Sequence, residues 1–466
     1  MSLTTDTKIK VNTRFGLSQP TNVGAVIGQG TIGGALVSQA VLDEAVMEHF
    51  IPGSDLHLNY GSVPLAPFMY QDDLVNGTED ISKARIANDK VDHLMKQRGL
   101  SLNEDKSVVM VIGSKKQKEK IANELKDNPL MCGTFETKEK QTEKYLGQIL
   151  SSAGLADSVA VTIEARLGKI KGACHEIAHI INDWRAQAIG GIDTAIFLWE
   201  TCCISSLMNG SGTWVDISAK TEKTLNSIQQ WFIRLILQVG PGAPTASLLW
   251  DLALLDMGLW LWREKLMLML HISRLDEESL ARQTYEEQKL NNWPGLFKET
   301  SEICKQLGIE DVHSTKMKKN DYRKHITEAC HSENEKRLRK QMEGKIKCER
   351  IENEEYGKKE YTKNKDINGV RQMFRSRFKM QPFAGNYSKD NRFSRTEWLC
   401  RCKEAREEES HLMDGNCPIY GEIRQKYDNL DDDETLAQFF KEILALRDKL
   451  EKDEIEDNIN YLGGGV

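Results

Sequence analysis

The spacing of apolar residues changes once along the chain, and this change most limits what the chain can fold into. Up to about residue 153, strand-like and helix-like segments alternate around glycine-containing turns. After Gly154, apolar residues recur almost everywhere at every third or fourth position, as on one face of a helix. We therefore predict an α+β fold, in which a mixed amino-terminal part is followed by a mainly helical part and a small tail.

The composition excludes two classes of protein. Of the 466 residues, 39% are hydrophobic and 29% are charged, which is too few apolar residues for a membrane bundle and too many for a disordered chain. The most apolar stretch, residues 248–270, is interrupted by charged residues and predicts a buried helix pair. The amino terminus has no basic flank followed by an apolar run. We expect an intracellular protein, nuclear or cytoplasmic or both, that is not secreted and has no membrane partner.

The chain divides into five predicted segments. They are a mixed domain (residues 1–153), a helical domain with a tryptophan-containing core (154–300), a charged helical connector (301–366), a basic segment with a cysteine cluster (367–430) and an acidic helical tail (431–466). Residues 323–365 are rich in lysine and glutamate and poor in aliphatic residues, which predicts a solvated helix or a linker.

Two short motifs lie in the first half of the mixed domain. Gly28-Gln29-Gly30 opens a predicted helix, where glycine allows close backbone approach and free N–H groups face a phosphate; a tight turn is the alternative. Tyr70-Gln71-Asp72-Asp73 ends an apolar segment and predicts a buried strand, an acidic turn and a second strand. Paired carboxylates of this kind hold Mg²⁺. A solvated acidic turn is the alternative.

Two further motifs lie near the end of the mixed domain. Asn103 and Lys106 follow a predicted helix and precede a strand. A lysine at the edge of an anionic site could protonate a departing phosphate, and an exposed surface lysine is the alternative. Tyr145-Leu146-Gly147 lies on a predicted strand, where glycine beside an aromatic residue suits contact with a nucleic-acid backbone.

In this order and at these separations, the four motifs resemble the later motifs of a reverse transcriptase palm of the non-LTR retrotransposon (LINE) type. The resemblance implies an RNA-directed DNA polymerase that uses two Mg²⁺ ions for nucleotidyl transfer. Its partners would be an RNA template, a DNA primer or target, and deoxynucleoside triphosphates. Residues 1–153 would be a partial palm of antiparallel strands and helices, and residues 154–300 a helical thumb.

The resemblance also assigns roles to individual residues. Asp72 and Asp73 would be the Mg²⁺ ligands, and with Lys106, the proton donor, they would be the catalytic residues. The nucleotide and template site would comprise Gly28, Gln29, Gly30, Tyr70, Gln71 and Asn103. The primer grip would comprise Tyr145, Leu146 and Gly147.

The family has a third catalytic aspartate on an apolar strand before the Gly-Gln-Gly turn. Here the one aspartate before Gly28 is Asp6, which lies among threonines. We therefore expect an incomplete two-ion site in a carboxyl-terminal portion of an element protein. The alternative is a non-catalytic RNA- or DNA-binding remnant. An RNA-dependent RNA polymerase shares the palm and the aspartate pair, but it explains neither residues 145–147 nor the cysteine cluster.

The cysteine cluster predicts a zinc site. Cys400, Cys402, His411 and Cys417 supply three thiolates and an imidazole within eighteen residues, which is the ligand set of a closed tetrahedral site. The pattern resembles the CCHC zinc knuckle that this family often carries. Free thiols are the alternative.

A basic and aromatic segment precedes the cysteines. Cations follow phosphates and aromatic rings stack on bases, so the mixture predicts binding of single-stranded nucleic acid. The residues are Arg371, Phe374, Arg375, Arg377, Phe378 and Lys379. The alternative is an amphipathic docking segment with a solvated basic face.

Overall fold

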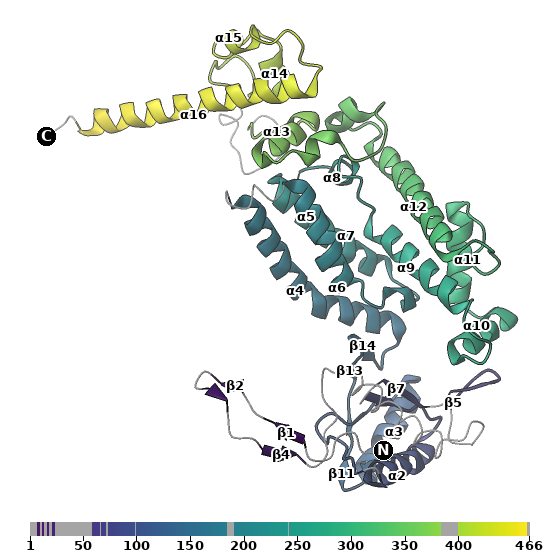
Figure 1. The fold of residues 1–466 in the computed structure, drawn as a ribbon. Coiled ribbons are helices and arrows are strands. Elements are labelled where there is room, and N and C mark those ends of the chain that lie inside the picture. Colours follow the sequence, from purple (N-terminus) through teal and green to yellow (C-terminus); the bar gives the residue numbers. More distant parts are fainter. Residues whose placement is uncertain are drawn as a thin grey trace. The chain divides into compact units, whose positions relative to one another are not determined.

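The computed structural model describes residues 7–9, 12–13, 16–17, 21–23, 58–65, 67–70, 73–97, 99–183, 191–240, 242–383 and 399–463. Helices dominate, and the strands form small two-stranded sheets, so the fold is α+β as predicted (Figure 1). The chain forms two compact units: unit 1 comprises residues 1–159 and 271–298, and unit 2 comprises residues 160–270 and 299–466. Within the described part of the chain, no helix is both long and apolar enough to cross a membrane.

Unit 1 contains short strands that pair two by two. The pairs are β1 (Thr7–Ile9) with β4 (Thr21–Val23), β2 (Asn12–Thr13) with β3 (Gly16–Leu17), β5 (Leu58–Tyr60) with β6 (Val63–Leu65), β7 (Phe68–Tyr70) with β8 (Asp73–Val75), β9 (Val108–Val109) with β12 (Lys138–Glu139), β10 (Met131–Cys132) with β11 (Phe135–Glu136), and β13 (Thr142–Tyr145) with β14 (Gln148–Ser151). The β9–β12 pair is parallel, and the other pairs are antiparallel.

Helix α2 (Ile81–Gln97) carries the apolar core of unit 1. Its buried residues Ala87, Val91, Leu94 and Met95 recur at helical spacing, and Leu74 of β8 packs against them. The chain leaves the helix through Gly99, whose positive φ of 70° suits a glycine. Because Leu74 contacts the helix, the β7–β8 hairpin is anchored to α2. The other helices of this unit are α3 (Lys115–Asp127) and α10 (Leu280–Asn291).

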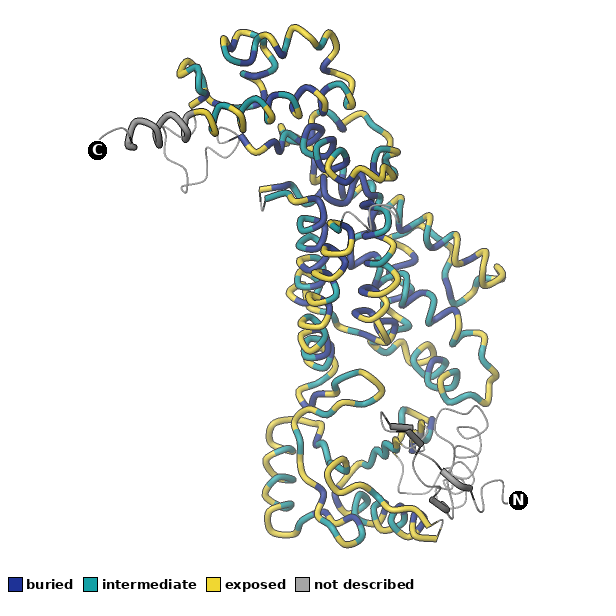
Figure 2. Tube along the Cα trace, turned by 60° about the vertical axis from the view of Figure 1, so that its left-hand side comes forward, coloured by how far each residue is buried: buried dark blue, intermediate teal, exposed yellow. Residues whose placement is uncertain are grey.

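Unit 2 is helical. Its elements are α4 (Leu155–Asn182, shared with unit 1), α5 (Ile192–Leu198), the π-helix η2 (Trp199–Ile204), α6 (Ser205–Leu207), the 3₁₀ turn η3 (Ser211–Thr213), α7 (Ala219–Leu237), α8 (Thr245–Trp250), α9 (Met257–Ile272), α11 (Leu296–Leu307), α12 (Lys319–Met342), the 3₁₀ helices η4 (Ile346–Ile351) and η5 (Glu360–Lys363), α13 (Ile367–Arg377), α14 (Glu409–Met413), α15 (Gly421–Arg424) and α16 (Asp433–Gly463). Most of the fully buried residues lie in this unit (Figure 2).

The core of the helical bundle contains a tryptophan, as predicted. Trp199 is fully buried and stacks on Phe232 of α7 with 4.8 Å between ring centroids. Trp231 is half-buried and meets His175 of α4 edge to face, whereas Trp184 lies outside the described residues. Residues 248–270 form the predicted pair of buried helices, α8 and α9, because their leucines face the interior. The prediction of a buried helix pair for this stretch is therefore confirmed.

Within the charged connector, Lys319–Met342 forms the packed helix α12, so the prediction of a solvated helix or linker was wrong for this part. One residue in every four along α12 is buried: Tyr322, Ile326, Cys330, Asn334, Leu338 and Met342. The side-chain amide of Asn334 donates to the carbonyl of Leu254, at 2.9 Å, and to the Tyr356 hydroxyl, at 2.8 Å. This single narrow stripe of buried residues is enough to pack α12 against its neighbours. Charged residues occupy the other faces of the helix.

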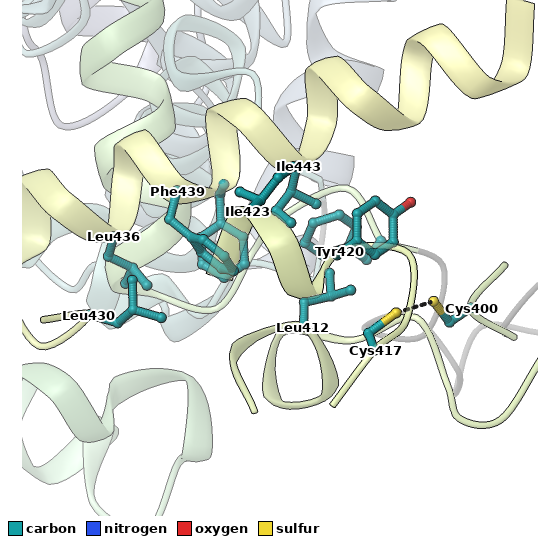
Figure 3. Packing of buried hydrophobic residues seen from close by; sticks show 11 residues of the cluster. Cys400, Leu412, Cys417, Tyr420, Ile423, Leu430, Leu436, Phe439 and Ile443 are labelled. Atoms are coloured by element: carbon teal, nitrogen blue, oxygen red, sulfur yellow. Dashed lines mark hydrogen bonds between the residues drawn. The ribbon is translucent and has the colours of Figure 1, made fainter. Parts of the chain in front are cut away.

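The carboxyl-terminal module has its own core. Phe439, Phe440 and Ile443 on one face of α16 pack against Leu412 and Tyr420, beside the cysteines (Figure 3). The acidic tail predicted for residues 431–466 is helical, but its first turns belong to the same module as the cysteine cluster.

Candidate metal centre and palm motifs

A tight turn presents the first two cysteines. Leu399 pairs with Arg406 in an isolated antiparallel bridge, and the N–H of Cys400 donates to the carbonyl of Ala405 at 2.8 Å. The N–H of Lys403 donates to the carbonyl of Cys400 at 2.8 Å, and Lys403 has a positive φ of 64°. The chain therefore reverses within a few residues, and the one-residue spacing between Cys400 and Cys402 is compatible with both thiols reaching one point.

The other two residues of the cluster come from the next elements. His411 lies on the short helix α14, and Cys417 follows Gly415, whose φ is 76°. The carbonyl of Cys417 accepts a hydrogen bond of 2.7 Å from the N–H of Gly421, at the start of α15. The buried ring of Tyr420 and the side chain of Leu412 lie beneath this loop, so the apolar core of the module holds the loop in place.

The four side chains converge on one point. Their ligand atoms all lie within 4.8 Å of one another. The Sγ atoms of Cys400 and Cys417 are 3.7 Å apart, and Sγ of Cys402 is 3.4 Å from Nε2 of His411. Ligands at usual tetrahedral zinc distances would stand roughly 3.3–3.8 Å apart, so these two distances fit. The cluster could hold a metal ion such as zinc.

The protonation of the cysteines matters to metal binding. Cys400 and Cys417 are buried, and Cys402 and His411 are half-buried. Burial raises the pKa of the Cys400 thiol. A metal binds the thiolate form, so binding of a metal ion here would release a proton from this thiol.

The predicted acidic turn is the tip of the β7–β8 hairpin. Tyr70 of β7 pairs with Asp73 of β8. Gln71 and Asp72 themselves lie outside the described residues. The hairpin was predicted correctly, but its burial was not: Phe68 is 45% exposed and Tyr70 is 55% exposed on one face of β7. Only the opposite side of the hairpin, through Leu74, reaches the core.

The segment predicted as the primer grip is a second hairpin tip. Tyr145 of β13 pairs with Gln148 of β14, and Leu146 and Gly147 connect them with φ values of 46° and 80°. Two positive φ values in a two-residue connection are typical of a type I′ turn. Burial, and to a smaller extent the Asp73 carboxylate, raise the pKa of Tyr145, so Asp73 lies within electrostatic reach of this hairpin. Two motifs that are far apart in sequence therefore lie in the same part of unit 1.

The remaining residues that the resemblance assigns to the nucleotide site and to proton donation divide into two groups. Asn103 and Lys106 lie in the exposed connection between α2 and β9, where the N–H of Lys106 donates to the side-chain oxygen of Asn103 at 3.2 Å. Asn103 thus shapes the turn that presents Lys106 to solvent. Gly28, Gln29 and Gly30 lie outside the described residues.

The basic segment differs from the expectation of a solvent-facing surface. Arg371 and Arg377 of α13 are each only 4% exposed. Nε of Arg371 donates to the carbonyl of Ile236, and burial lowers its pKa to about 10. Nε of Arg377 donates to Asp251 at 2.8 Å. Both guanidinium groups therefore bind partners inside the fold. The prediction that Arg371 and Arg377 contact nucleic acid is corrected, because they are structural residues here.

The aromatic residues of the segment are corrected in the same way. Phe374 and Phe378 are fully buried and contact each other with 4.7 Å between ring centroids, so neither ring is open to a base. Arg375 donates to the carbonyl of Gln238 at 2.7 Å, and Lys379 pairs with Glu349 at 2.7 Å. The alternative of an amphipathic docking segment describes α13 better, although its basic face is not solvated.

Two features of this region were missed from the sequence. The apolar face of α16, with Leu436, Phe439, Phe440 and Ile443 at helical spacing, was a visible signal that the tail packs. The pairing of Asp251 with Arg377 had no local signal, since more than a hundred residues separate them.

No protein-family model matches the chain, and no curated protein is significantly similar to it. The resemblance to reverse transcriptases therefore depends on the sequence motifs alone.

Proposed function

We propose that this chain is part of an RNA-directed DNA polymerase of the non-LTR reverse transcriptase type. The observation that carries the proposal is that Asp73 of one hairpin lies within electrostatic reach of Tyr145, at the tip of the other hairpin. In the family that the motifs resemble, the first tip binds Mg²⁺ and the second holds the primer. A primer held beside the metal ions has its terminal hydroxyl next to the incoming triphosphate, as in-line transfer requires.

Primer extension on an RNA template tests this proposal. The wild-type chain should extend a DNA primer in the presence of Mg²⁺, but slowly, because its two-ion site is expected to lack the third aspartate. The double variant Asp72→Asn with Asp73→Asn should lower extension by roughly 100-fold or more, because it removes the charge that holds the metal. The control is Glu104→Gln with Asp105→Asn, which neutralises an exposed adjacent acidic pair in the same unit. Equal activity in the two double variants would exclude this role for the aspartates.

A non-catalytic RNA- or DNA-binding protein is the second candidate, and the exposed aromatic face of β7 favours it. Phe68 and Tyr70 present half-exposed rings on the same side of the hairpin, where they could stack on bases. In that case the chain binds single-stranded RNA in a salt-sensitive manner but extends no primer. Phe68→Ala with Tyr70→Ala should weaken this binding, whereas Ile86→Ala with Leu100→Ala, exposed apolar residues of the same unit, should not.

The cysteine cluster, we propose, binds Zn²⁺ in a structural role. All four positions are filled by protein ligands, which leaves no open position for a reacting water. Elemental analysis should find one zinc ion per wild-type chain and none in Cys417→Ser. Cys202→Ser, which removes an exposed thiol outside the cluster, should keep the metal. Loss of zinc from both variants, or zinc-free wild-type protein, would contradict the assignment.

A further inference from the structure

A pocket in unit 2 is lined by neither the palm motifs nor the cysteine cluster. Its volume is about 400 Å³, and its walls are the loop around η3, one face of α9 and the start of α12. Pockets of this size accommodate a small ligand or a single nucleotide rather than a folded partner. The chemistry of the walls indicates which ligand.

The pocket carries an excess of positive charge. Arg263, Lys319 and Arg323 line it, against one carboxylate, Glu264. Lys319 and Arg323 are one turn apart on α12 and are exposed, and neither side chain has an ion-pair partner among the residues that the structure describes. Two cations that face the same opening without a counter-charge attract an anion.

Arg263 is held in place from two sides. Its guanidinium lies over the ring of Trp260, 3.8 Å from the centroid, and its Nη2 is 3.1 Å from Oε1 of Glu264. Stacking and one carboxylate contact fix the plane of the guanidinium while leaving further N–H donors. Glu264 therefore orients the arginine and only partly neutralises the pocket.

The loop wall contains a buried hydroxyl group that needs a partner. Ser211 lines the pocket, is 1% exposed, and its Oγ has no hydrogen-bond partner within the described chain. Gly210 has a positive φ of 73°, and a Cβ at Gly212 would lie 3.0 Å from the carbonyl oxygen of Glu264. The glycines thus allow the loop to lie directly on α9. Buried polar groups are rarely left unsatisfied, so the hydroxyl indicates a missing ligand or water.

We propose that this pocket binds a phosphate group carried by a nucleotide or an oligonucleotide. A guanidinium fork, two exposed cationic side chains and a hydroxyl donor together match the oxygens of a phosphate ester. The volume leaves room for the attached sugar. The inference does not depend on the proposed polymerase function, because it uses no residue of the two hairpin tips.

Binding of phosphate probes to the full-length protein tests the proposal. Titration calorimetry would compare inorganic phosphate, a nucleoside monophosphate, and a short RNA with either a 5′-phosphate or a 5′-hydroxyl. Tighter binding of the monophosphate than of inorganic phosphate would identify a nucleotide ligand. Tighter binding of the 5′-phosphorylated RNA than of its 5′-hydroxyl counterpart would identify the end of a strand. The wild-type protein should bind at least one phosphate-bearing probe.

Charge-matched variants locate the binding. Lys319→Gln with Arg323→Gln should weaken binding roughly tenfold or more, because charged hydrogen bonds to the phosphate are lost. Lys324→Gln with Lys336→Gln removes two exposed charges of the same helix outside the pocket and should leave the affinity unchanged. Ser211→Ala should weaken binding severalfold without lowering the melting temperature. Absence of binding to all probes, or equal losses in the two double variants, would overturn the proposal.

The test is separate from the polymerase assay. Phosphate binding is measured without template or primer, so failure of primer extension leaves this result intact. Equally, extension that survives Lys319→Gln with Arg323→Gln shows only that the pocket is not part of the polymerase site.

Discussion

Arg377 carries its charge into the interior of unit 2. Its guanidinium contacts Asp251 and Glu354 and also donates to Asp433. Burial alone would lower the pKa of Arg377, but these carboxylates raise it overall, so the group stays charged. The hydroxyl of Tyr361 donates to the same Asp251 at 2.6 Å. A buried ion pair of this kind adds little net stability, but it joins α13, the loop after α8 and the start of α16 in one arrangement.

His331 makes stability depend on pH. Burial, with a smaller contribution from Arg263, lowers the pKa of His331 below the value of about 6.5 usual in an unfolded chain. Between the two pKa values the unfolded chain binds a proton that the folded protein does not. The contribution of His331 to stability is therefore complete above about pH 6.5 and is lost as the pH falls toward the folded-state pKa.

A substitution tests this dependence. The free energy of unfolding, measured by urea denaturation at pH 7.5 and about pH 5.5, should fall less on acidification in His331→Gln than in the wild type. His179→Gln replaces an exposed histidine of α4 and should behave as the wild type does. A wild-type loss that is the same in His331→Gln would assign the pH dependence to other groups.

At the scale of the element, the β13–β14 hairpin has an unfavourable residue at its tip. Leu146 has a positive φ of 46° and is 45% exposed, so packing gives little compensation for its left-handed conformation. Asparagine followed by glycine is the favoured pair for this turn. Strain of this kind often lies at functional positions, which agrees with the role proposed for the tip.

Leu146→Asn should stabilise the protein. We expect the free energy of unfolding to rise by about 1 kcal/mol, because asparagine tolerates the left-handed conformation. Leu150→Asn, at a half-exposed strand position of the same hairpin, should give no such gain. Denaturant unfolding of the two variants would measure the difference, and a loss of stability in Leu146→Asn would show that the leucine side chain itself is needed.

At the scale of the whole molecule, the carboxyl-terminal module is tied to the bundle through α13 and α16. The two helices are in contact, and Arg350 of η4 also pairs with Asp433 at 3.3 Å. The core of the module is small and is built around the cysteine loop. A core of this size usually needs a bound metal ion or a disulfide bond to be stable.

Metal removal should therefore loosen the module before the bundle. Hydrogen exchange after chelation should speed up in residues 399–453 while α7, deep in the bundle, stays protected. Cys417→Ser without a chelator should show the same pattern, and added zinc should restore the chelated wild type but not this variant. Uniform exchange over both regions would show that the metal supports the bundle as well.

The sequence by itself determined the features that depend on neighbouring residues. The β7–β8 hairpin followed from an apolar run before Asp72 and Asp73, and the convergence of Cys400 and Cys417 from their spacing. Each of these depends on backbone preferences or ligand chemistry within a few residues, which composition and spacing express directly.

Only the tertiary structure decided which charged and aromatic residues face solvent. Arg377 and Phe378 belong to a segment that is basic and aromatic in sequence, yet they are buried because Asp251 and the bundle are brought to them from far along the chain. Phe68 and Tyr70 are apolar in sequence, yet they are exposed because only the other face of the hairpin packs on α2. Burial depends on what packs against a side chain, and distant partners leave no local pattern.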